Sequence, residues 1–329
     1  MRCPQIKELP LPPSGKTGWP WTEDSPWVAD SMPSGCHWPK ISIVTPSFNQ
    51  GRFIEETIRS VLLQGYPDVE YTVIDGGSED GSREIIEKYS KWLTYWVSEL
   101  DQGQSHAINK GLIRSTGALA GWLNSDDIYL PGTFWIVSNQ FSLHPEIEMI
   151  YGDINLVNEN GEFIAELRSH QVGPEDATRL TFIPQPACFW RAGLFQQIGY
   201  LNENYSHVFD LDYWLRISLR YKVLHCSYLL ASFRVHENAK TQKNEILTAL
   251  EGLTLNKNLF TNPSTPKHIL KFKRKELRHW HERLARAYLD KGKKWDACRF
   301  FLKAMFITPW RPQNLKLLAI IMNTILKTR

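Results

Sequence analysis

The sequence predicts an α/β fold with a mostly parallel sheet flanked by helices, followed by an α-helical C-terminal extension. Between residues 40 and 131, short apolar runs alternate with segments of helical periodicity, which is typical of strands joined by right-handed crossovers. Polar residues directly follow three of these runs, as they do at the carboxyl edge of an open sheet. From residue 246 the chain is basic and helical in pattern. We therefore expect three parts, 1–39, 40–245 and 246–329.

The composition is that of a globular protein with an unevenly charged chain. The 329 residues are 42% hydrophobic, enough for a core, and carry a net charge of +3. Residues 267–303 hold thirteen Lys or Arg against four Asp or Glu. That stretch therefore carries 13 − 4 = +9, and the remainder sums to 3 − 9 = −6. Such a basic face is either a solvated surface or a contact for anionic lipid or an acidic partner. We expect no nucleic-acid partner.

Cysteine usage and the lack of long apolar windows bear on the compartment. The five cysteines show no short paired spacing: Cys3, Cys36, Cys188, Cys226 and Cys298. An odd count in a long chain favours free thiols in a reducing compartment. No window reaches the ~20 apolar residues of a spanning helix, and the first residues contain no apolar signal segment. We expect a cytoplasmic protein, either free or peripheral at the inner face of the cell membrane.

Residues 1–39 are rich in Pro and Trp and show neither helical nor strand periodicity. A disordered arm seldom carries so many tryptophans, so we expect an extended segment that lies over the domain surface. The string Gly15-Lys16-Thr17 resembles a phosphate loop. That motif needs a glycine where Pro10 stands and a preceding strand, so we exclude it.

Strands are expected at 41–45, 71–74, 93–97 and 118–123, where apolar residues run together. Helices are expected between them, because apolar residues recur at helical spacing around Ile54, around Ile85 and up to Asn109. A further helix should begin near Pro131. The strand ends then place three polar loops on one edge of the sheet, at 45–49, 75–80 and 124–127.

The loop that begins at Asp75 has the composition of a nucleotide site. Its glycines at 76, 77 and 81 let the backbone approach a flat base or a ribose. The Asp75 carboxylate can accept a hydrogen bond from a base N–H or a ribose hydroxyl. The same residues also make a tight turn before a helix that Ser82 would cap. This loop alone does not separate the two interpretations.

The stretch 119–131 changes abruptly from an apolar run into Asn124, Asp126 and Asp127. Carboxylates this close raise each other's pKa unless a cation compensates, so a divalent metal is the natural partner. Asn124 and Asp126 would point the same way on an extended segment. The alternative is a turn in which Asn124 or Asp126 caps the next helix.

In order and spacing, the segments Ile41–Asn49, Val73–Ser82 and Leu123–Asp127 resemble the inverting glycosyltransferases of family 2, which have the GT-A fold. Segments 185–190, 209–216 and 233–241 fit the same family. The resemblance covers about residues 40–245 and implies a nucleotide-binding half, 40–130, and an acceptor half, 131–245. It also implies a nucleotide-diphosphate sugar donor, expected to be a UDP-sugar, a Mg²⁺ or Mn²⁺ cofactor, and a glycan or lipid-linked acceptor in surface-polysaccharide synthesis.

On the matching positions, the resemblance implies that Asp75 contacts the base and that Asp210 is the catalytic base. Asn124 and Asp126 would lie beside the ribose and the metal-bound diphosphate. The implied donor-binding set is Pro46, Ser47, Asn49, Asp75, Gln104, Asn109, Asn124, Ser125 and Arg234, and the implied metal set is Asp126, Asp127 and His236.

Two positions depart from the family pattern. Asn124 replaces the first carboxylate of the DxD-type metal motif, so Asp126, with Asp127, must supply more of the negative charge that binds the metal. Ile108 precedes Asn109 where many members have arginine, which puts one nucleotide contact in doubt.

Sugar transfer needs compensation of charge on the leaving diphosphate and a base for the attacking hydroxyl. A metal held by Asp126 supplies the first as a Lewis acid. A carboxylate within about 3 Å supplies the second and typically contributes ~10²–10⁴-fold. Asp210 starts an apolar-faced helix and is our candidate base, the alternatives being that it only caps this helix or that Asp212 is the base. In-line attack inverts the anomeric centre and requires no enzyme nucleophile.

Arg234 and His236 project from the same side of an extended run, and either could reach the diphosphate. His236 could equally be a surface residue before a helix. The acceptor-side candidates are Trp190, Asp212 and Trp214. The rings of Trp190, Trp214 and Tyr213 could form a platform for an acceptor sugar, although aromatic residues at these spacings are more often part of a core.

The tail matches one tetratricopeptide-like unit through Leu284-Ala285, Tyr288, Gly292, Ala297, Phe301, Ala304 and Pro309. A lone unit cannot bury its own face. It must dock on the catalytic domain, on a last helix expected at 313–326, or on another protein. That last helix has an apolar side with basic residues around it, which fits core packing or an anionic membrane surface.

Two rival functions stay open on the sequence alone, and the oligomeric state is not indicated. A nucleotidyltransferase would need a basic glycine-rich loop after the first strand, and residues 47–52 offer too little. A non-catalytic nucleotide-sugar-binding protein or tetratricopeptide-like scaffold would keep the fold without turnover. The intact Asp75, Asp126 and Asp210 argue against a decayed site.

Overall fold

The computed structural model describes residues 1–32, 35–173, 176, 183–237, 240, 244–309 and 319. The chain forms two compact units, Met1–Gln171 with Thr181–His236, and Val172–Leu180 with Glu237–Arg329. The boundaries expected at residues 40 and 245 follow motifs rather than compactness and stay a prediction.

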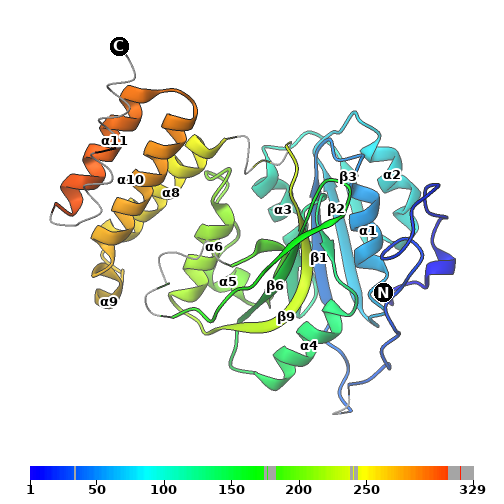
Figure 1. The fold of residues 1–329 in the computed structure, drawn as a ribbon. Coiled ribbons are helices and arrows are strands. Elements are labelled where there is room, and N and C mark those ends of the chain that lie inside the picture. Colours follow the sequence, from blue (N-terminus) through cyan, green and yellow to red (C-terminus); the bar gives the residue numbers. More distant parts are fainter. Residues whose placement is uncertain are drawn as a thin grey trace. The chain divides into compact units, whose positions relative to one another are not determined.

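The first unit is built on a sheet that has nine strands within the described residues (Figure 1). Its order is β3-β2-β1-β4-β8-β6-β9-β5, and β7 pairs with β6. The first four strands are parallel, whereas β8 runs antiparallel to β4 and β6, and β9 runs parallel to β6. The strands are β1 (Ile41–Ser47), β2 (Val69–Asp75), β3 (Tyr95–Ser98), β4 (Leu119–Trp122), β5 (Ile128–Tyr129), β6 (Met149–Val157), β7 (Phe163–Leu167), β8 (Cys188–Arg191) and β9 (Val223–Arg234).

Helices connect the parallel strands as the sequence predicts. The helices of this unit are α1 (Ile54–Leu62), α2 (Ser82–Lys88), α3 (Gln104–Leu112), α4 (Thr133–Leu143), α5 (Leu194–Ile198) and α6 (Phe209–Ser218). The helix α3 packs closely on β1, because a Cβ added at Gly111 would lie 2.5 Å from the Val44 side chain. The predicted α/β class, with helices on a sheet that is parallel in its first half, is confirmed.

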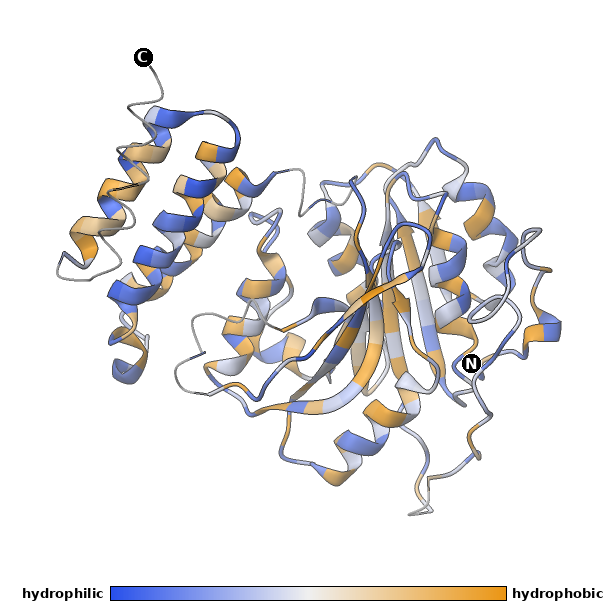
Figure 2. Cartoon of the chain, viewed as in Figure 1, coloured by the Kyte–Doolittle hydropathy of each residue, from blue (hydrophilic) through white to orange (hydrophobic). Residues whose placement is uncertain are grey.

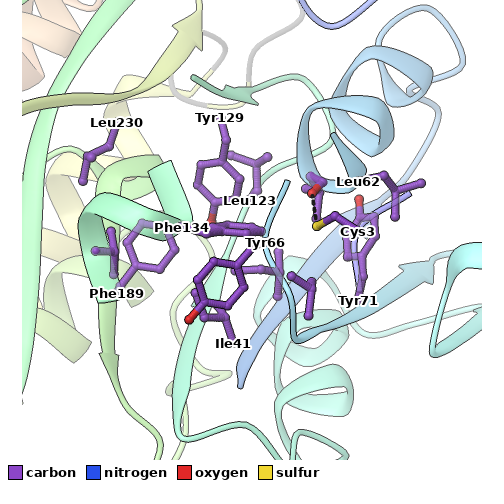
Figure 3. Packing of buried hydrophobic residues seen from close by; sticks show 14 of the residues in the cluster. Cys3, Ile41, Leu62, Tyr66, Tyr71, Leu123, Tyr129, Phe134, Phe189 and Leu230 are labelled. Carbon is purple, nitrogen blue, oxygen red and sulfur yellow. Dashed lines mark hydrogen bonds between the residues drawn. The ribbon is translucent and has the colours of Figure 1, made fainter. Parts of the chain in front are cut away.

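The core of this unit gathers aromatic and aliphatic side chains from the sheet, α1 and α4 (Figure 3). The Phe134 ring lies 5.3 Å from the Tyr129 ring and 6.0 Å from the Tyr66 ring, centroid to centroid. The Tyr129 ring also lies 5.4 Å from the Phe189 ring. Full burial of one such side chain contributes roughly 1.5–3 kcal/mol. This packing holds the start of α4 against the sheet just after the 124–127 loop.

The N-terminal arm belongs to the first unit, and one buried arginine fastens it. The Arg59 guanidinium donates to the carbonyl oxygens of Pro10, Pro20 and Trp21 at 2.9–3.0 Å and to the Tyr89 hydroxyl at 3.0 Å. Carbonyl oxygens buried in this way need donors, and a guanidinium has five N–H groups. The arm is thereby bound to α1, the helix that follows the first strand of the site.

The second unit is helical in its described residues. It contains α8 (Glu245–Thr261), α9 (Lys267–Leu270), α10 (Lys273–Asp290) and α11 (Lys294–Ile307). The hairpin of α10 and α11 turns at Gly292, whose φ is +72°, and packs through Ala285, Ala297, Cys298, Phe301 and Ala304. Figure 2 shows apolar and polar residues side by side along these helices.

The helical extension is therefore present, while its tetratricopeptide-like character stays a prediction. The helix expected at 313–326 lies outside the described residues, apart from Ala319. Within the part of the chain that the structure describes, every helix is too short or too polar to cross a membrane.

Candidate functional site

The carboxyl ends of β1, β2 and β4 meet at one edge of the sheet, as expected. Val44 of β1 pairs with Thr72 of β2 on one side and with Trp122 of β4 on the other. Asp75 lies three residues beyond Thr72, and Asn124 lies two residues beyond Trp122, so both emerge at similar height. Because β1 separates β2 from β4, the two loops are about 10 Å apart, two strand spacings.

The Asp75 carboxylate is buried and shapes its own turn. It accepts hydrogen bonds from the Gly77 N–H (3.2 Å), the Ser78 N–H (2.9 Å), the Ser78 Oγ (2.6 Å) and the Ser98 Oγ (2.7 Å). A base contact at Asp75 would therefore exchange one of the two serine hydroxyls for a ligand donor. The expected cap at Ser82 is wrong: Gly81 precedes α2, and the Asp80 Oδ1 accepts the Ser82 N–H at 3.1 Å.

The end of β1 leads directly into the Asp75 loop. Pro46 pairs with Ile74, and the Ser47 carbonyl accepts the Gly76 N–H at 2.8 Å. The Ser47 Oγ is buried and has no hydrogen-bond partner among the described residues. Asn49 has a positive φ of 52°, and its Oδ1 accepts the Glu79 N–H at 3.1 Å. The loops that follow β1 and β2 are thus joined by a backbone hydrogen bond and by a bond from a backbone N–H to the Asn49 side chain.

Phe48 is a candidate site residue that the sequence reasoning missed. Its side chain is 60% exposed although it follows a fully buried strand. A Cβ built on Gly76 would lie 3.3 Å from the Phe48 ring and 2.7 Å from an Asp101 carboxylate oxygen, so Gly76 admits no side chain there. An accessible ring beside a glycine turn offers a flat surface for a nucleobase. The available signal was an aromatic residue within an otherwise polar loop.

Residues 124–127 form a turn rather than the expected extended segment, because the Asp127 N–H donates to the Asn124 carbonyl at 3.1 Å. Asn124 and Asp126 therefore have different side-chain partners. The Asn124 Oδ1 accepts from the Gln104 Nε2 at 2.8 Å, and the Asp126 Oδ2 lies 3.0 Å from the His236 Nε2. The turn brings the amide network and the carboxylate–imidazole pair side by side.

Gln185 is the second residue that the sequence reasoning missed. Its Oε1 accepts from the Asn124 Nδ2 at 2.9 Å, and its Nε2 donates to the Trp122 carbonyl at 2.8 Å. It opens the 3-10 helix Gln185–Ala187, which leads into β8, the neighbour of β4, and this explains how a residue 61 positions away reaches the turn. A neutral amide does not by itself indicate a functional site in a sequence. The available signal was the place of Gln185 at the start of segment 185–190, which resembles the family.

Hydrogen bonds from Arg234 hold the turn of residues 124–127 in place, and Asp127 accepts one of them. The Arg234 guanidinium donates to the Asp126 carbonyl at 2.9 Å and pairs with Glu56 at 3.0 Å, and only 1% of its side chain is exposed. The Asp127 Oδ1 accepts the Arg234 N–H at 3.0 Å. Burial, and then the charge of Asp126, raise the pKa of Asp127 well above its ordinary value. These contacts make Arg234 a positioning residue and leave Asp127 inside the fold.

Asp126 and His236 have the chemistry of metal ligands. The Asp126 side chain is 19% exposed, and His236 is nearly buried, with its ring 4.9 Å from the Phe53 ring. Within the described residues, no cluster of three or more His, Cys, Asp or Glu side chains is arranged to hold a metal. Magnesium is commonly held by one or two carboxylates plus substrate phosphates, so the Asp126 carboxylate fits a site completed by a diphosphate. The His236 imidazole is a further candidate ligand, because imidazole nitrogens commonly bind metals.

Asp210 is half-buried at the second position of α6, where its Oδ1 accepts the Leu211 N–H at 2.7 Å. Burial, and then the charge of Asp210, raise the pKa of the Cys188 thiol well above its ordinary value. The charge of Asp210 thus acts on the first residue of β8, which lies three residues beyond Gln185 in the chain. Asp212 instead pairs with the Arg216 Nε at 2.9 Å, and its pKa is raised by burial despite that partner.

Four other expected site residues are used inside the protein. The Trp190 and Trp214 rings are buried and pack on Trp122, so they belong to the core and offer no accessible acceptor platform. Asn109 bonds the backbone of Leu201 through both amide atoms, at 2.9 and 3.0 Å. Ser125 is buried within the turn.

Residues 42–162 match the family described as Glycosyl transferase family 2. An uncharacterized glycosyltransferase of Rickettsia felis is 26% identical over 225 residues, which is 64% of this chain and 36% of that protein. This chain thus spans about a third of the length of that relative.

Solved structures share the fold. TarS 1–349 of S. aureus, solved in complex with UDP-GlcNAc, has a TM-score of 0.63 at 16% identity, covering 87% of this chain and 89% of TarS 1–349. Mannosyltransferase PcManGT from Pyrobaculum calidifontis, solved with GDP-Man and Mn²⁺, has a TM-score of 0.57 at 15% identity, covering 92% and 84%. Residues 42–162 are therefore similar to the glycosyl transferases of family 2, and the chain shares its fold, GT-A, with these solved structures.

Proposed function

We propose that this protein moves a sugar from a nucleotide-diphosphate sugar to a hydroxyl of a glycan or lipid-linked acceptor, with inversion and with a divalent cation. The observation that carries the proposal is the Asp126–His236 pair, 3.0 Å apart, beside the Asn124 amide network at the carboxyl edge of the sheet. A pair of oxygen and nitrogen donors next to neutral hydrogen-bonding groups suits a metal-bound diphosphate and a ribose.

The donor would extend along the sheet edge from the β2 loop to the β4 loop. Phe48 offers a ring face for the base, and Asp75 offers a carboxylate for a base N–H. The roughly 10 Å between these loops suits a nucleoside diphosphate whose base and phosphates occupy opposite ends. UDP is our expected nucleotide, and the solved neighbours with UDP-GlcNAc and GDP-Man make GDP the alternative.

Asp126 and His236 would hold the cation together with the diphosphate oxygens. When bound, the cation offsets the charge that develops on the leaving diphosphate. The turn that presents Asp126 is kept in place by Arg234 and Asp127, which leaves little freedom for the carboxylate to move away. Preorganisation of this kind contributes more than the same groups would in water.

Asp210 would accept the proton of the attacking hydroxyl. Its charge acts on Cys188 at the start of β8, and a half-buried carboxylate at the start of a helix can contact a bound acceptor. The acceptor class, and a role in cell-surface polysaccharide synthesis, are inferred from the family resemblance alone.

Thermal shift with UDP, GDP and dTDP, each with and without Mn²⁺, tests the donor half of the proposal. We expect one nucleotide to raise the melting temperature only when the metal is present, because the diphosphate completes the coordination. Asp126→Ala should abolish that shift, whereas the exposed Asp296→Ala in the second unit should keep it. If no nucleotide stabilises the protein with metal, a non-catalytic scaffold becomes the better interpretation.

Hydrolysis and transfer assays with a panel of nucleotide sugars test the catalytic half. Asp210→Asn should bind the donor normally while turnover falls by about 10²–10⁴-fold. Asp212→Asn should instead lower stability, because it weakens the pair with Arg216. Near-normal turnover by Asp210→Asn would assign the proton transfer to another group.

A further inference from the structure

The helix α11 has two apolar faces, of which one has no partner within the described residues. Ala297, Phe301 and Ala304 are buried against α10. Trp295, Leu302 and Phe306 lie on the opposite side and are 76%, 42% and 80% exposed. Offsets of seven and four residues place these three side chains in one line along the helix. Large aromatic side chains so exposed in a line mark an interaction surface.

Basic residues lie beside this line of exposed side chains, Trp295, Leu302 and Phe306, which we call the stripe. Arg299 lies within it, four residues after Trp295, and Lys303 is exposed beside Leu302. At the start of the helix, Lys293 and Lys294 line a surface hollow together with Trp295. Residues 267–303, which include all of α10 and most of α11, carry thirteen basic against four acidic residues. The surface thus combines aromatic side chains with strong positive charge.

We propose that the outer face of α11 docks on an anionic membrane surface, with Trp295, Leu302 and Phe306 in the interface and the basic side chains on lipid headgroups. Aromatic residues favour the boundary between headgroups and acyl chains, and Lys and Arg are attracted to anionic lipid. The 14 residues of α11 span about 21 Å, enough to lie in the plane of the interface.

Charge complementarity distinguishes this partner from the others. An apolar groove on another protein would satisfy the aromatic stripe but not the neighbouring basic side chains of Lys293, Arg299 and Lys303. A second copy of this hairpin would bring two basic surfaces together, which costs free energy by like-charge repulsion. The proposal does not depend on the sugar-transfer reaction, so either can fail without the other.

Vesicle sedimentation of the full chain tests the proposal. We expect it to sediment with vesicles of phosphatidylcholine plus phosphatidylglycerol, not with phosphatidylcholine alone, and to be released by salt. Trp295→Ser and Phe306→Ser should each reduce the partition coefficient about tenfold, because each removes a large apolar side chain from the interface. Trp135→Ser on α4, which alters another exposed tryptophan, is the matched control.

Charge is tested by Arg299→Glu, which should weaken sedimentation, against Arg83→Glu on α2, which should not. All these side chains are exposed, so unchanged melting temperatures will show that the variants fold. The proposal is overturned if sedimentation of the protein does not depend on anionic lipid in the vesicles. It is also overturned if Trp295→Ser and Phe306→Ser both sediment as fully as the wild type.

Two other occupants of the stripe would also overturn it. A dimer that dissociates in Trp295→Ser, without vesicle binding by the wild type, would identify a second copy. Faster hydrogen exchange of residues 310–329 in Trp295→Ser, measured without vesicles, would show that the chain's own end covers this face.

Discussion

Arg234→Met is the variant that best separates ligand binding from positioning. The sequence suggested that this guanidinium reaches the diphosphate, whereas the structure places it beneath the turn, paired with Glu56 and bonded to the Asp126 carbonyl. Its side chain is 1% exposed and that of Glu56 is 12% exposed. Methionine has similar length and no charge, so the change removes the donors while filling much of the space.

The expected loss of stability is large. Removing one partner of a buried ion pair costs about 3–5 kcal/mol, because the remaining charge stays buried without compensation. The matched control is Arg52→Met: Arg52 also lies over the Phe53 ring, at 5.3 Å against 5.0 Å for Arg234. The Arg52 pair with Glu159 is about half exposed on both sides, so its loss should cost no more than about 1 kcal/mol.

Urea unfolding of both variants measures the two losses, and a titration with UDP and Mn²⁺ measures donor affinity. We expect Arg234→Met to lose far more stability than Arg52→Met. We also expect it to bind the nucleotide more weakly, because the substitution removes the bond that holds the 124–127 turn in place. An Arg234→Met protein that unfolds like the control, while nucleotide binding alone disappears, would refute the positioning role and restore the direct contact.

Three further predictions concern packing, pH and the amide network. Gly252→Ala should destabilise the helical unit by about 1–3 kcal/mol in thermal unfolding, because the new Cβ would lie 2.1 Å from the Trp280 ring, whereas Gly193→Ala meets no atom within 4 Å and should not. Burial raises the pKa of Asp153, but bonds from the Ser169 N–H, His225 and Arg168 outweigh it and hold the pKa below its ordinary value. The stability from Asp153 is therefore present above pH ~4 and lost as pH falls through the lowered pKa, and Asp153→Asn should flatten the acid limb of a plot of urea midpoint against pH. Gln185→Ala should weaken donor affinity about fivefold with little change in kcat, because it removes the hydrogen bond that holds the Asn124 amide. Gln140→Ala on α4 is the control. An unchanged KM for the donor in Gln185→Ala would show that Gln185 is not part of the site.

Local patterns in the sequence were sufficient for the sheet and its polar edge. The four parallel strands and the helices between them were predicted because apolar periodicity and the breaks at glycine and proline depend only on neighbouring residues. The edge loops at 45–49, 75–80 and 124–127 follow from that alternation, since parallel strands must end on the same side.

Errors arose where a residue's environment depends on distant parts of the chain. Periodicity could not show that Trp190 and Trp214 pack on Trp122, because these three residues come from different elements. It could not show that Gln185 reaches Asn124 across 61 residues, or that Phe48 stays exposed.

The amino-acid sequence by itself determined which chemical groups stand at the sheet edge, because each polar loop directly follows a strand and parallel strands end on the same side of a sheet. Only the tertiary structure decided how those groups are used. In the folded chain, the Asn124–Asp127 segment forms a turn, Asp126 lies next to His236, and Arg234 donates a hydrogen bond to the Asp126 carbonyl. The physical reason is that buried carboxylates and guanidinium groups must find partners when water is excluded, and those partners come from β9 and α1, far away in sequence.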